Sequence, residues 1–341
     1  MTAASWPRGE PALDRLLHLD PRTCRKRDRR VGDLPALLKS GDLLVLNDSA
    51  TLPASLRGRL GDAPVELRLA GRRADGAWDA VLFGAGDWRT RTEDRPTPPP
   101  VRAGDRLSFG LQLTAVVEAV SAISPRLVTL RFEQTEDAFW TALYRHGLPI
   151  QYAYTAGPLA LWDTQTSYAT RPWSVEAPSA GRPLGAGLLS ALAKRGVGIE
   201  TLTHAAGLSS TGDPALDRAL PLPERYDLPA RTIAAIEATR ARGDRVVAVG
   251  TTVVRALEGC VRAHGRLRAG EGVTDLRIGA GFAPRIVDGI LTGMHEPEAS
   301  HFALLEAFAP RAVLAEAHAH AESVGYLAHE FGDSMLILAG A

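Results

Sequence analysis

The stretch that decides the fold is Arg245–Glu258, which reads RVVAVGTTVVRALE. Its first part, Val246 to Val249, is a short apolar run of the kind found in buried strands. The run breaks at Gly250, and two threonines then open a segment with helical spacing, so the sequence predicts a strand, a turn and a helix. The N–H groups at such a helix start can hold an anion, so we expect this turn to form the floor of a binding pocket.

Further blocks on both sides of this stretch share a pattern with one family. They are Asp33–Leu56 (DLPALLKSGDLLVLNDSATLPASL), Thr164–Ala169 (TQTSYA), Glu176–Gly181 (EAPSAG), Thr274–Phe282 (TDLRIGAGF), Val287–Pro297 (VDGILTGMHEP) and Phe331–Leu338 (FGDSMLIL). In this order and spacing they resemble the S-adenosylmethionine:tRNA ribosyltransferase-isomerases of queuosine biosynthesis. Any one block is weak evidence, but together they cover nearly the whole chain in collinear order.

Length and composition are those of a globular protein with a sizeable core. The chain has 341 residues, 45% of them hydrophobic, which permits two or three domains. Lys+Arg and Asp+Glu number 39 each, so there is no global basic field, and an RNA substrate would need a local basic face. The N-terminus has no signal-like pattern and no long apolar span occurs, so we expect a cytoplasmic protein with no membrane contact.

Two cysteines, Cys24 and Cys260, lie far apart and form no CxxC pair, which predicts reduced thiols rather than a zinc ribbon. His318 and His320 are two residues apart and would lie on different sides of a helix, so no metal site is expected.

The densest basic run, Arg22–Arg30, has two interpretations: contact with an RNA backbone, or a solvated loop balanced by nearby aspartates, which is the more common meaning.

Residues 57–148 differ from the rest of the chain in their pattern of short β-like runs between turn residues, which predicts an all-β insertion. Its strand-like runs are 65–70, 77–83, 105–110, 111–120 and 126–132, and the Arg-Pro-rich stretch 89–100 is expected to be an exposed loop. Outside the insertion, strand-like and helical runs alternate, which predicts an α/β layer built from residues 1–56 and 149–341. The resemblance agrees, because it implies a discontinuous α/β domain that carries an inserted small β-barrel.

The resemblance implies an unusual use of S-adenosylmethionine, which is consumed as a substrate. The ribosyl part is transferred to the aminomethyl group of a 7-deazaguanine in a tRNA anticodon, while adenine and methionine leave. The sulfonium acidifies the C5′ proton, so the site needs a base, an acid for adenine and a suitable electrostatic environment. No metal and no protein partner is implied.

The helix start supplies the first candidates for substrate binding. Thr251 and Thr252 lie at the expected anion site, and Arg255, one turn further, is placed to pair with the methionine carboxylate. Glu258 falls on the same face as Arg255, so it is either a binding residue or simply the partner of that arginine. Ordinary helix capping is the competing interpretation for one threonine.

Three residues are candidates for catalysis. Asp275 and Asp288 flank the GAGF turn, and a carboxylate near a sulfonium can stabilise the cation or accept its acidified proton. Asp275 could equally cap a turn. His295 matches the histidine of the family's corresponding block, and we interpret it as the acid for departing adenine, because imidazole can carry a proton near neutral pH.

Other candidates are placed by position or by the resemblance alone. Asn47 and Asp48 follow an apolar run, at a strand end where α/β folds often contact ligands, and an ordinary turn is the equal alternative. Tyr168 is a candidate to cover adenine, with core packing as the alternative. The resemblance adds further substrate-binding candidates, of which Asp333 also fits a turn before a strand: Pro178, Gly181, Thr274, Thr292 and Asp333.

Several family positions are changed, and they belong to the side expected to hold the acceptor. The family has arginines at Ala50 and Ser55, a His-Phe pair at Pro183 and Leu184, and an aromatic residue at Ala328. Arginines and aromatic rings are the groups that hold phosphate and stack bases. Two alternatives to the family reaction therefore stay open: a relative that uses a small-molecule acceptor or eliminates adenine and methionine, and a catalytically silent nucleotide- or RNA-binding relative.

Overall fold

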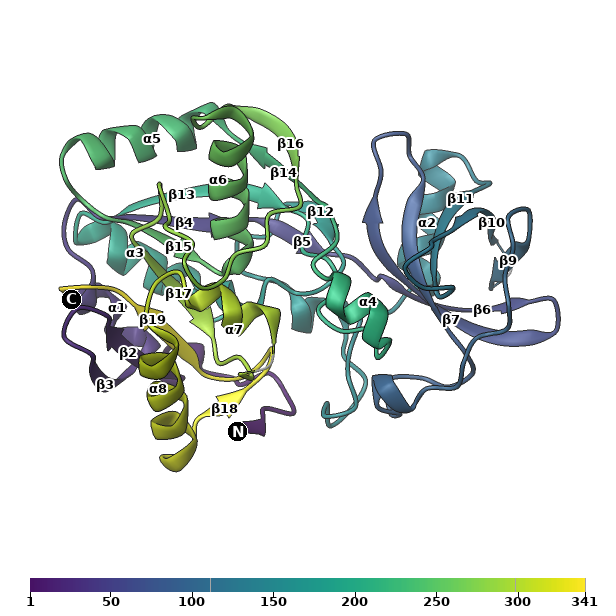
Figure 1. Cartoon of the computed structure of the whole chain (residues 1–341), viewed down its shortest axis with the longest axis horizontal. Coiled ribbons are helices and arrows are strands. Elements are labelled where there is room, and N and C mark those ends of the chain that lie inside the picture. The colour runs from purple at the N-terminus through teal and green to yellow at the C-terminus, as the bar shows by residue number, and fades with distance from the viewer. Residues whose placement is uncertain (111, 298, 341) are drawn as a thin grey trace.

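A computed structural model describes residues 1–110, 112–297 and 299–340, and it has a mixed α/β body with an attached β-barrel (Figure 1). The body is built on a nine-stranded sheet in the order β16-β14-β13-β4-β15-β17-β19-β2-β3. Its strands are β2 (Arg15–Asp20), β3 (Arg25–Arg30), β4 (Leu43–Asn47), β13 (Gly198–His204), β14 (Glu224–Leu228), β15 (Val246–Val249), β16 (Gly270–Thr274), β17 (Gly289–Gly293) and β19 (Ser334–Ile337). The predicted fold class is confirmed.

The centre of the sheet is parallel, and its strands β4 and β15 are buried on both faces. β4 pairs in parallel with β13 and with β15, and β15 pairs in parallel with β17. Alternate residues of β4 enter different cores: Val45 packs on one face, whereas Leu44 and Leu46 pack on the other. Burial on both faces explains why these strands read as continuous apolar runs rather than alternating ones.

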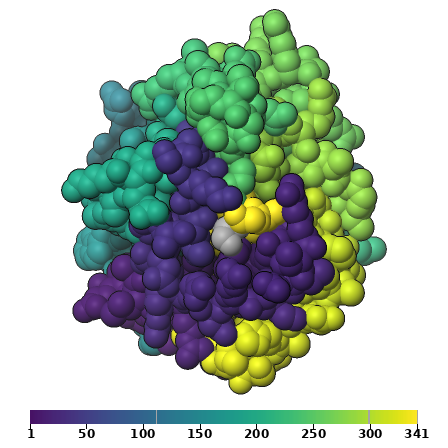
Figure 2. Space-filling view, turned by 90° about the vertical axis from the view of Figure 1, so that its left-hand side faces the viewer, coloured from purple at the N-terminus to yellow at the C-terminus, as the bar shows by residue number. Residues whose placement is uncertain are grey.

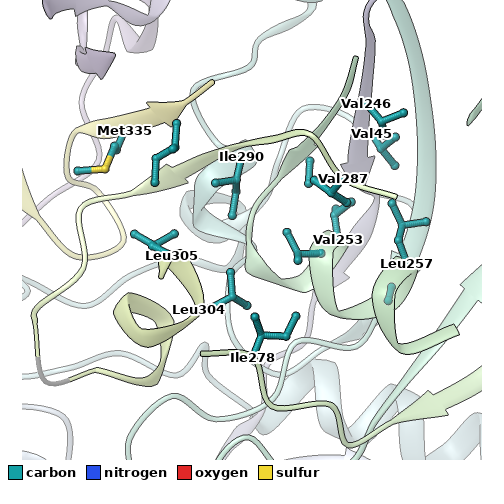
Figure 3. Packing of buried hydrophobic residues seen from close by; sticks show 14 of the residues in the cluster. Val45, Val246, Val253, Leu257, Ile278, Val287, Ile290, Leu304, Leu305 and Met335 are labelled. Atoms are coloured by element: carbon teal, nitrogen blue, oxygen red, sulfur yellow. The ribbon is translucent and has the colours of Figure 1, made fainter. Parts of the chain in front are cut away.

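Helices cover both faces of the sheet. One core contains residues of α5 (Ala230–Ala241), α6 (Thr251–His264), α7 (Ser300–Leu305) and α8 (Arg311–Ser323), and the other contains α1 (Leu34–Leu37) and α3 (Ala186–Lys194). Figure 3 shows Val253 and Leu257 of α6 together with Val45 and Val246 of the sheet. The predicted strand, turn and helix at β15 and α6 are confirmed.

The inserted region closes into a barrel with the strand order β10-β11-β8-β7-β6-β9. Its elements are β6 (Ser55–Leu60), β7 (Ala63–Arg72), β8 (Trp78–Phe83), β9 (Arg106–Phe109), β10 (Leu113–Val120), β11 (Leu127–Phe132) and the helix α2 (Glu136–His146). Each predicted strand is present; Leu111, within one predicted run, lies outside the described residues. The sequence reasoning missed β6, which falls at the expected boundary. The domain limits 57–148 stay a prediction.

The barrel lies beside the body and is joined to it by several segments (Figure 1). One of them contains the helix α4 (Pro214–Ala219), whose Leu216 packs in the barrel core although it is remote in sequence. The stretch 89–100 is not fully exposed as predicted. Arg95 is buried, because its guanidinium pairs with the buried Glu66 of β7 and donates to the carbonyl of Gly84 at 2.8 Å.

The two ends of the chain meet in the body. β2 pairs in parallel with β19, and short strands β1 (Thr2–Ala3) and β18 (Leu327–Ala328) also pair. Figure 2 shows the N-terminal segment in purple on both sides of the C-terminal residues in yellow. The basic run forms the edge strand β3 rather than the loop expected from sequence.

Smaller features complete the description. β5 (Ser49–Thr51) pairs in parallel with β12 (Arg171–Ser174) and continues the chain from β4 towards the barrel. Cys24 is exposed and Cys260 is buried, and both are free thiols, as predicted. Within the described residues, no helix has the length and apolar character needed to span a bilayer.

Candidate active site

A cavity of about 810 Å³ opens at the carboxyl ends of the central parallel strands. Ligands bind at this end of the strands in open α/β sheets. The body contributes the ends of β15 and β17 and the start of α6, and the loop Arg91–Glu93, next to the barrel, closes another side. The volume is in the range of pockets that hold drug-sized molecules.

The floor of the cavity is the turn from β15 into α6. Gly250 has φ of +88°, a left-handed conformation that side chains rarely adopt, which explains why a glycine breaks the apolar run. Thr251 and Thr252 follow at the helix start and line the cavity, as the sequence analysis expected of an anion site. Asn47 holds this turn, because its amide donates to Thr252 Oγ1 at 3.3 Å.

Asn47 itself is a cross-link of the sheet rather than a wall of the cavity. Its Nδ2 donates to the carbonyl of His204 at 3.0 Å, and its Oδ1 accepts from the amide of His204 at 2.9 Å. Asp48 accepts from Thr203 Oγ1 at 2.6 Å. Neither side chain is part of the cavity wall. They fix the positions of β4, β13 and α6 relative to one another.

Beside the floor lies a buried charge cluster that the sequence reasoning did not find. Arg255 pairs with Glu224, and its Nε donates to the carbonyl of Leu276 at 3.1 Å. Glu224 also lies 3.2 Å from His204 Nε2. Burial raises the pKa of Glu224, and the positive charge of Arg255 acts against this rise. Burial lowers the pKa of His204 well below its usual value. One guanidinium nitrogen of Arg255, Nη2, is buried without a partner among the described residues.

Glu258 is not the partner of Arg255. Its carboxylate accepts from the backbone amides of Arg285 at 2.9 Å, Ile286 at 2.9 Å and Val287 at 3.1 Å. This contact fastens α6 to the segment that leads into β17. The binding role inferred for Glu258 from its helical spacing has no support in its position, because Glu258 is not part of the cavity wall.

His295 lies at the cavity wall beyond the end of β17. Its Nε2 is 2.7 Å from Thr292 Oγ1, and its ring stacks on His301 with centroids 5.1 Å apart. Burial lowers the pKa of His295 well below its usual value, and His301 and His329 lower it further. Burial lowers the pKa of His301 to about 4. Both imidazoles are therefore neutral near pH 7, and the acid role expected of His295 stays a prediction.

Two tyrosine–glutamate pairs also line the cavity. The hydroxyl of Tyr152 donates to Glu176, and the hydroxyl of Tyr154 donates to Glu330. Burial raises the pKa of Glu176, and it raises the pKa of Glu330 to about 7. Glu330 therefore holds its proton in part at neutral pH and can supply one.

Three predicted aspartates lie outside the cavity wall. Asp288 precedes β17, so it is at the amino end of the parallel strands, where its carboxylate accepts from the amide of Val246 at 2.8 Å. Asp275 is exposed. Asp333 accepts from Arg8 at 2.8 Å and from the amide of Arg15 at 3.0 Å, so it joins two distant segments. None of the three is among the residues that line the cavity.

Of the other predicted residues, two line the cavity and the rest lie behind its wall. Pro178 and Thr292 line the cavity. Tyr168 instead packs with the core under α1 and α3, and Gly181 lies so close that a Cβ there would be 1.9 Å from the Tyr168 hydroxyl. Thr274 accepts from the amide of Leu276 at 3.1 Å and stays behind the wall. For Tyr168 the packing alternative is the one that its contacts match.

The cavity wall thus adds residues that were not among the candidates from sequence: Glu224, Tyr152, Tyr154, Glu176, His301 and Glu330. Glu176 opens the EAPSAG block and carried a signal, since it is a charged residue in a long ordered loop. The others had none, because their partners are distant in sequence: Tyr154 and Glu330 are 176 residues apart.

Comparison with known proteins identifies the family. The model of the family described as queuosine biosynthesis protein matches residues 2–337. The chain belongs to this family. A relative from Acidiphilium cryptum, named S-adenosylmethionine:tRNA ribosyltransferase-isomerase, is 35% identical over 95% of this chain and 92% of its own length. A relative of the same name from Thermus thermophilus is 36% identical over 92% and 89%.

A solved structure extends the family comparison to three dimensions. The S-adenosylmethionine tRNA ribosyltransferase from Thermotoga maritima is 28% identical and has a TM-score of 0.53, over 98% of this chain and 96% of that chain. The family resemblance seen in the sequence blocks is therefore confirmed over the full length. Within the described residues, no group of three or more His, Cys, Asp or Glu side chains is arranged to hold a metal ion.

Proposed function

We propose that this protein is an S-adenosylmethionine:tRNA ribosyltransferase-isomerase, which transfers the ribosyl part of S-adenosylmethionine to the aminomethyl group of a 7-deazaguanine in tRNA and releases adenine and methionine. The observation that carries the proposal is the coincidence of the family's GTT turn with a large cavity at the carboxyl ends of the parallel strands. Full-length relatives with this printed name support it.

The residues present fit an amino-acid carboxylate at the cavity floor. The amides at the start of α6 point towards the cavity end of the helix, and the threonine hydroxyls lie beside them. The buried, unpartnered Nη2 of Arg255 adds a charged donor. We assign these groups to the methionine carboxylate. The carboxyl groups of Glu176 and Glu224 in the same cavity suit the sulfonium cation.

Proton transfer then divides between two groups with opposite pKa shifts. His295, neutral and close to the end of β17, is the candidate to accept the acidified C5′ proton. Glu330, whose pKa is raised to about 7, is the candidate proton donor. An acid and a base whose environments separate their pKa values are what this reaction requires. Asp275 and Asp288 have no part in the assignment.

The test is incubation of the pure protein with S-adenosylmethionine, with and without tRNA that carries 7-aminomethyl-7-deazaguanine. Adenine, methionine and the mass of the tRNA are followed by mass spectrometry. We expect release of both products only with that tRNA, together with a ribosyl-derived mass gain. Release without tRNA would instead mean a small-molecule acceptor or elimination, and no release despite binding would mean a silent relative.

A further inference from the structure

Three rings stack along one wall of the cavity. Tyr152 and Tyr154 have ring centroids 6.0 Å apart with 17° between their planes, and Tyr154 and His329 have centroids 4.4 Å apart at 25°. The inner end abuts the barrel, where the buried Arg68 guanidinium lies 5.5 Å from the Tyr152 centroid. The outer end, His329, is exposed. The stack therefore runs from the barrel core to the solvent.

A carboxyl group with spare hydrogen-bonding capacity accompanies the outer end of the stack. Glu330 follows His329 in sequence and accepts from the Tyr154 hydroxyl through Oε2. Among the described residues, no other side chain hydrogen-bonds to Glu330. Glu176, at the inner end, is more fully occupied, since it accepts from the Tyr152 hydroxyl and, at 3.2 Å, from the amide of Ser209. Glu330 is thus the carboxyl group that can accept donors from a ligand.

The cavity also has exposed positive charge on its lining. Arg91 pairs with Glu93 but its side chain is 70% exposed, and Arg277 is exposed as well. Exposed arginines around an opening suit the phosphates of a polymer rather than a small neutral molecule. A base that remains attached to RNA needs such an open entrance, because its ribose and phosphates stay outside.

We propose that the stacked rings Tyr152, Tyr154 and His329, together with the carboxyl group of Glu330, form the subsite for the acceptor base of the RNA. The assignment rests on the proposed function. Because Tyr154 lies between Tyr152 and His329, the ring open to a base is His329 at the exposed end of the stack. A 7-deazaguanine offers a flat ring for that end, N–H donors for a carboxylate, and an ammonium on its aminomethyl arm. Unpaired bases are recognised in this way, by stacking on rings and hydrogen bonds to their edges.

The adenine of S-adenosylmethionine is the other flat ring that this wall could accept. Two observations favour the acceptor base. The aminomethyl ammonium matches Glu330, whereas adenine carries no cation. The exposed end at His329 admits a base on a polymer, whereas a free nucleoside needs no such opening. The assignment therefore predicts that changes in this wall affect RNA recognition and leave recognition of S-adenosylmethionine intact.

The experiment measures two Michaelis constants with an anticodon stem-loop that carries 7-aminomethyl-7-deazaguanine. For Glu330→Gln we expect KM for the stem-loop to rise about 10- to 100-fold, with KM for S-adenosylmethionine within about twofold of wild type. Tyr154→Phe keeps the ring but loses the hydroxyl, so a smaller rise is expected. Glu237→Gln, an exposed change on α5, is the matched control. A rise in KM for S-adenosylmethionine alone, or no change in either constant, would overturn the assignment.

A binding measurement separates this subsite from the reaction itself. Fluorescence anisotropy compares stem-loops that carry 7-aminomethyl-7-deazaguanine or guanine at the same position. We expect wild type to prefer the modified base and Glu330→Gln to lose that preference, even if no turnover were detected and the proposed function failed. Equal preference in wild type and Glu330→Gln, with both proteins folded by thermal melting, would refute the subsite whatever the activity.

Discussion

The central parallel strands have two ends that use the same residue types differently. At the amino end, Asp42 pairs with Arg245, whose Nε lies 3.0 Å from Asp42 Oδ1 and whose Nη1 donates to the carbonyl of Ala339 at 2.8 Å. At the carboxyl end, Arg255 pairs with Glu224 but keeps a buried nitrogen without a partner among the described residues. The arginine at the amino end makes its hydrogen bonds within the protein, whereas Arg255 at the carboxyl end keeps a donor that can bind a ligand. An ion pair alone does not identify a binding site, but a buried hydrogen-bond donor without a partner beside a cavity does.

The largest expected effect comes from breaking the carboxyl-end pair. Arg255→Met leaves Glu224 buried without its partner, so we expect a loss of about 3–5 kcal/mol in the free energy of unfolding, measured by urea titration. Activity should fall at least about 100-fold through loss of the carboxylate-binding group.

The double change Arg255→Met with Glu224→Leu sharpens that experiment. Removing both charges should recover most of the stability, because no buried charge is left unpaired, but it should not recover activity. A stable double variant with near wild-type kcat/KM would show that the pair is structural, like its counterpart at the amino end.

The amino-end pair should affect stability alone. Asp42→Ala is expected to lower the free energy of unfolding by about 3 kcal/mol, because Asp42 is buried and also accepts from the amide of Lys39 at 2.7 Å. Activity per folded molecule should stay within about twofold of wild type. Asp244→Ala, which removes a more exposed pair with Arg242, is the control and should cost less than about 1 kcal/mol. A selective fall in kcat for Asp42→Ala would break the contrast between the two ends.

A titrating group at the cavity should make stability depend on pH. Burial raises the pKa of Glu330 to about 7 in the folded protein, above its unfolded value, so the folded state holds the proton more tightly. Stability is then fully present below the unfolded pKa and is lost as pH rises towards 7. Glu330→Gln removes this loss, so its stability relative to wild type should improve by about 2 kcal/mol between pH 5 and pH 8, measured by urea titration. Parallel pH curves for the two proteins would contradict the shift.

The smallest effects on stability and kcat are expected for two aspartates that were predicted to be catalytic but do not line the cavity. Asp288→Ala should lower stability by about 1 kcal/mol, because it removes one acceptor for the amide of Val246. Asp275→Asn, at an exposed position, should change the free energy of unfolding by less than about 0.5 kcal/mol. Both should keep kcat within about threefold of wild type in the adenine-release assay. A 100-fold loss in either would restore the catalytic role inferred from sequence.

The fold was accessible from sequence where its signals are local. The apolar run before Gly250 and the threonines after it specify β15 and the start of α6, and the turn-bounded runs specify the barrel strands. The floor of the cavity was therefore predicted in the right place. β6 was missed because its sequence, Ser55–Leu60, continues a block that belongs to the body.

The walls of the cavity were not accessible, because they arise from pairs distant in the chain. Arg255 and Glu224 are 31 residues apart, on different elements, and no periodicity links them. The position of Asp288 could have been predicted: it precedes its strand, whereas Gly250 follows one, so in a parallel sheet they lie at opposite ends. Its membership in a shared block indicated importance but not location.

The pairing of β2 with β19 sets the order in which a ribosome can complete this protein. His18 of β2 contacts the carbonyl of Leu338, 320 residues further along the chain, at 3.1 Å. The strand synthesised early must wait for the strand synthesised late, whereas the barrel strands all lie between Ser55 and Phe132 and can associate while the rest is still being made. During translation the barrel strands would therefore pair before the sheet of the body can close, and Leu216 of α4 would complete the barrel core later.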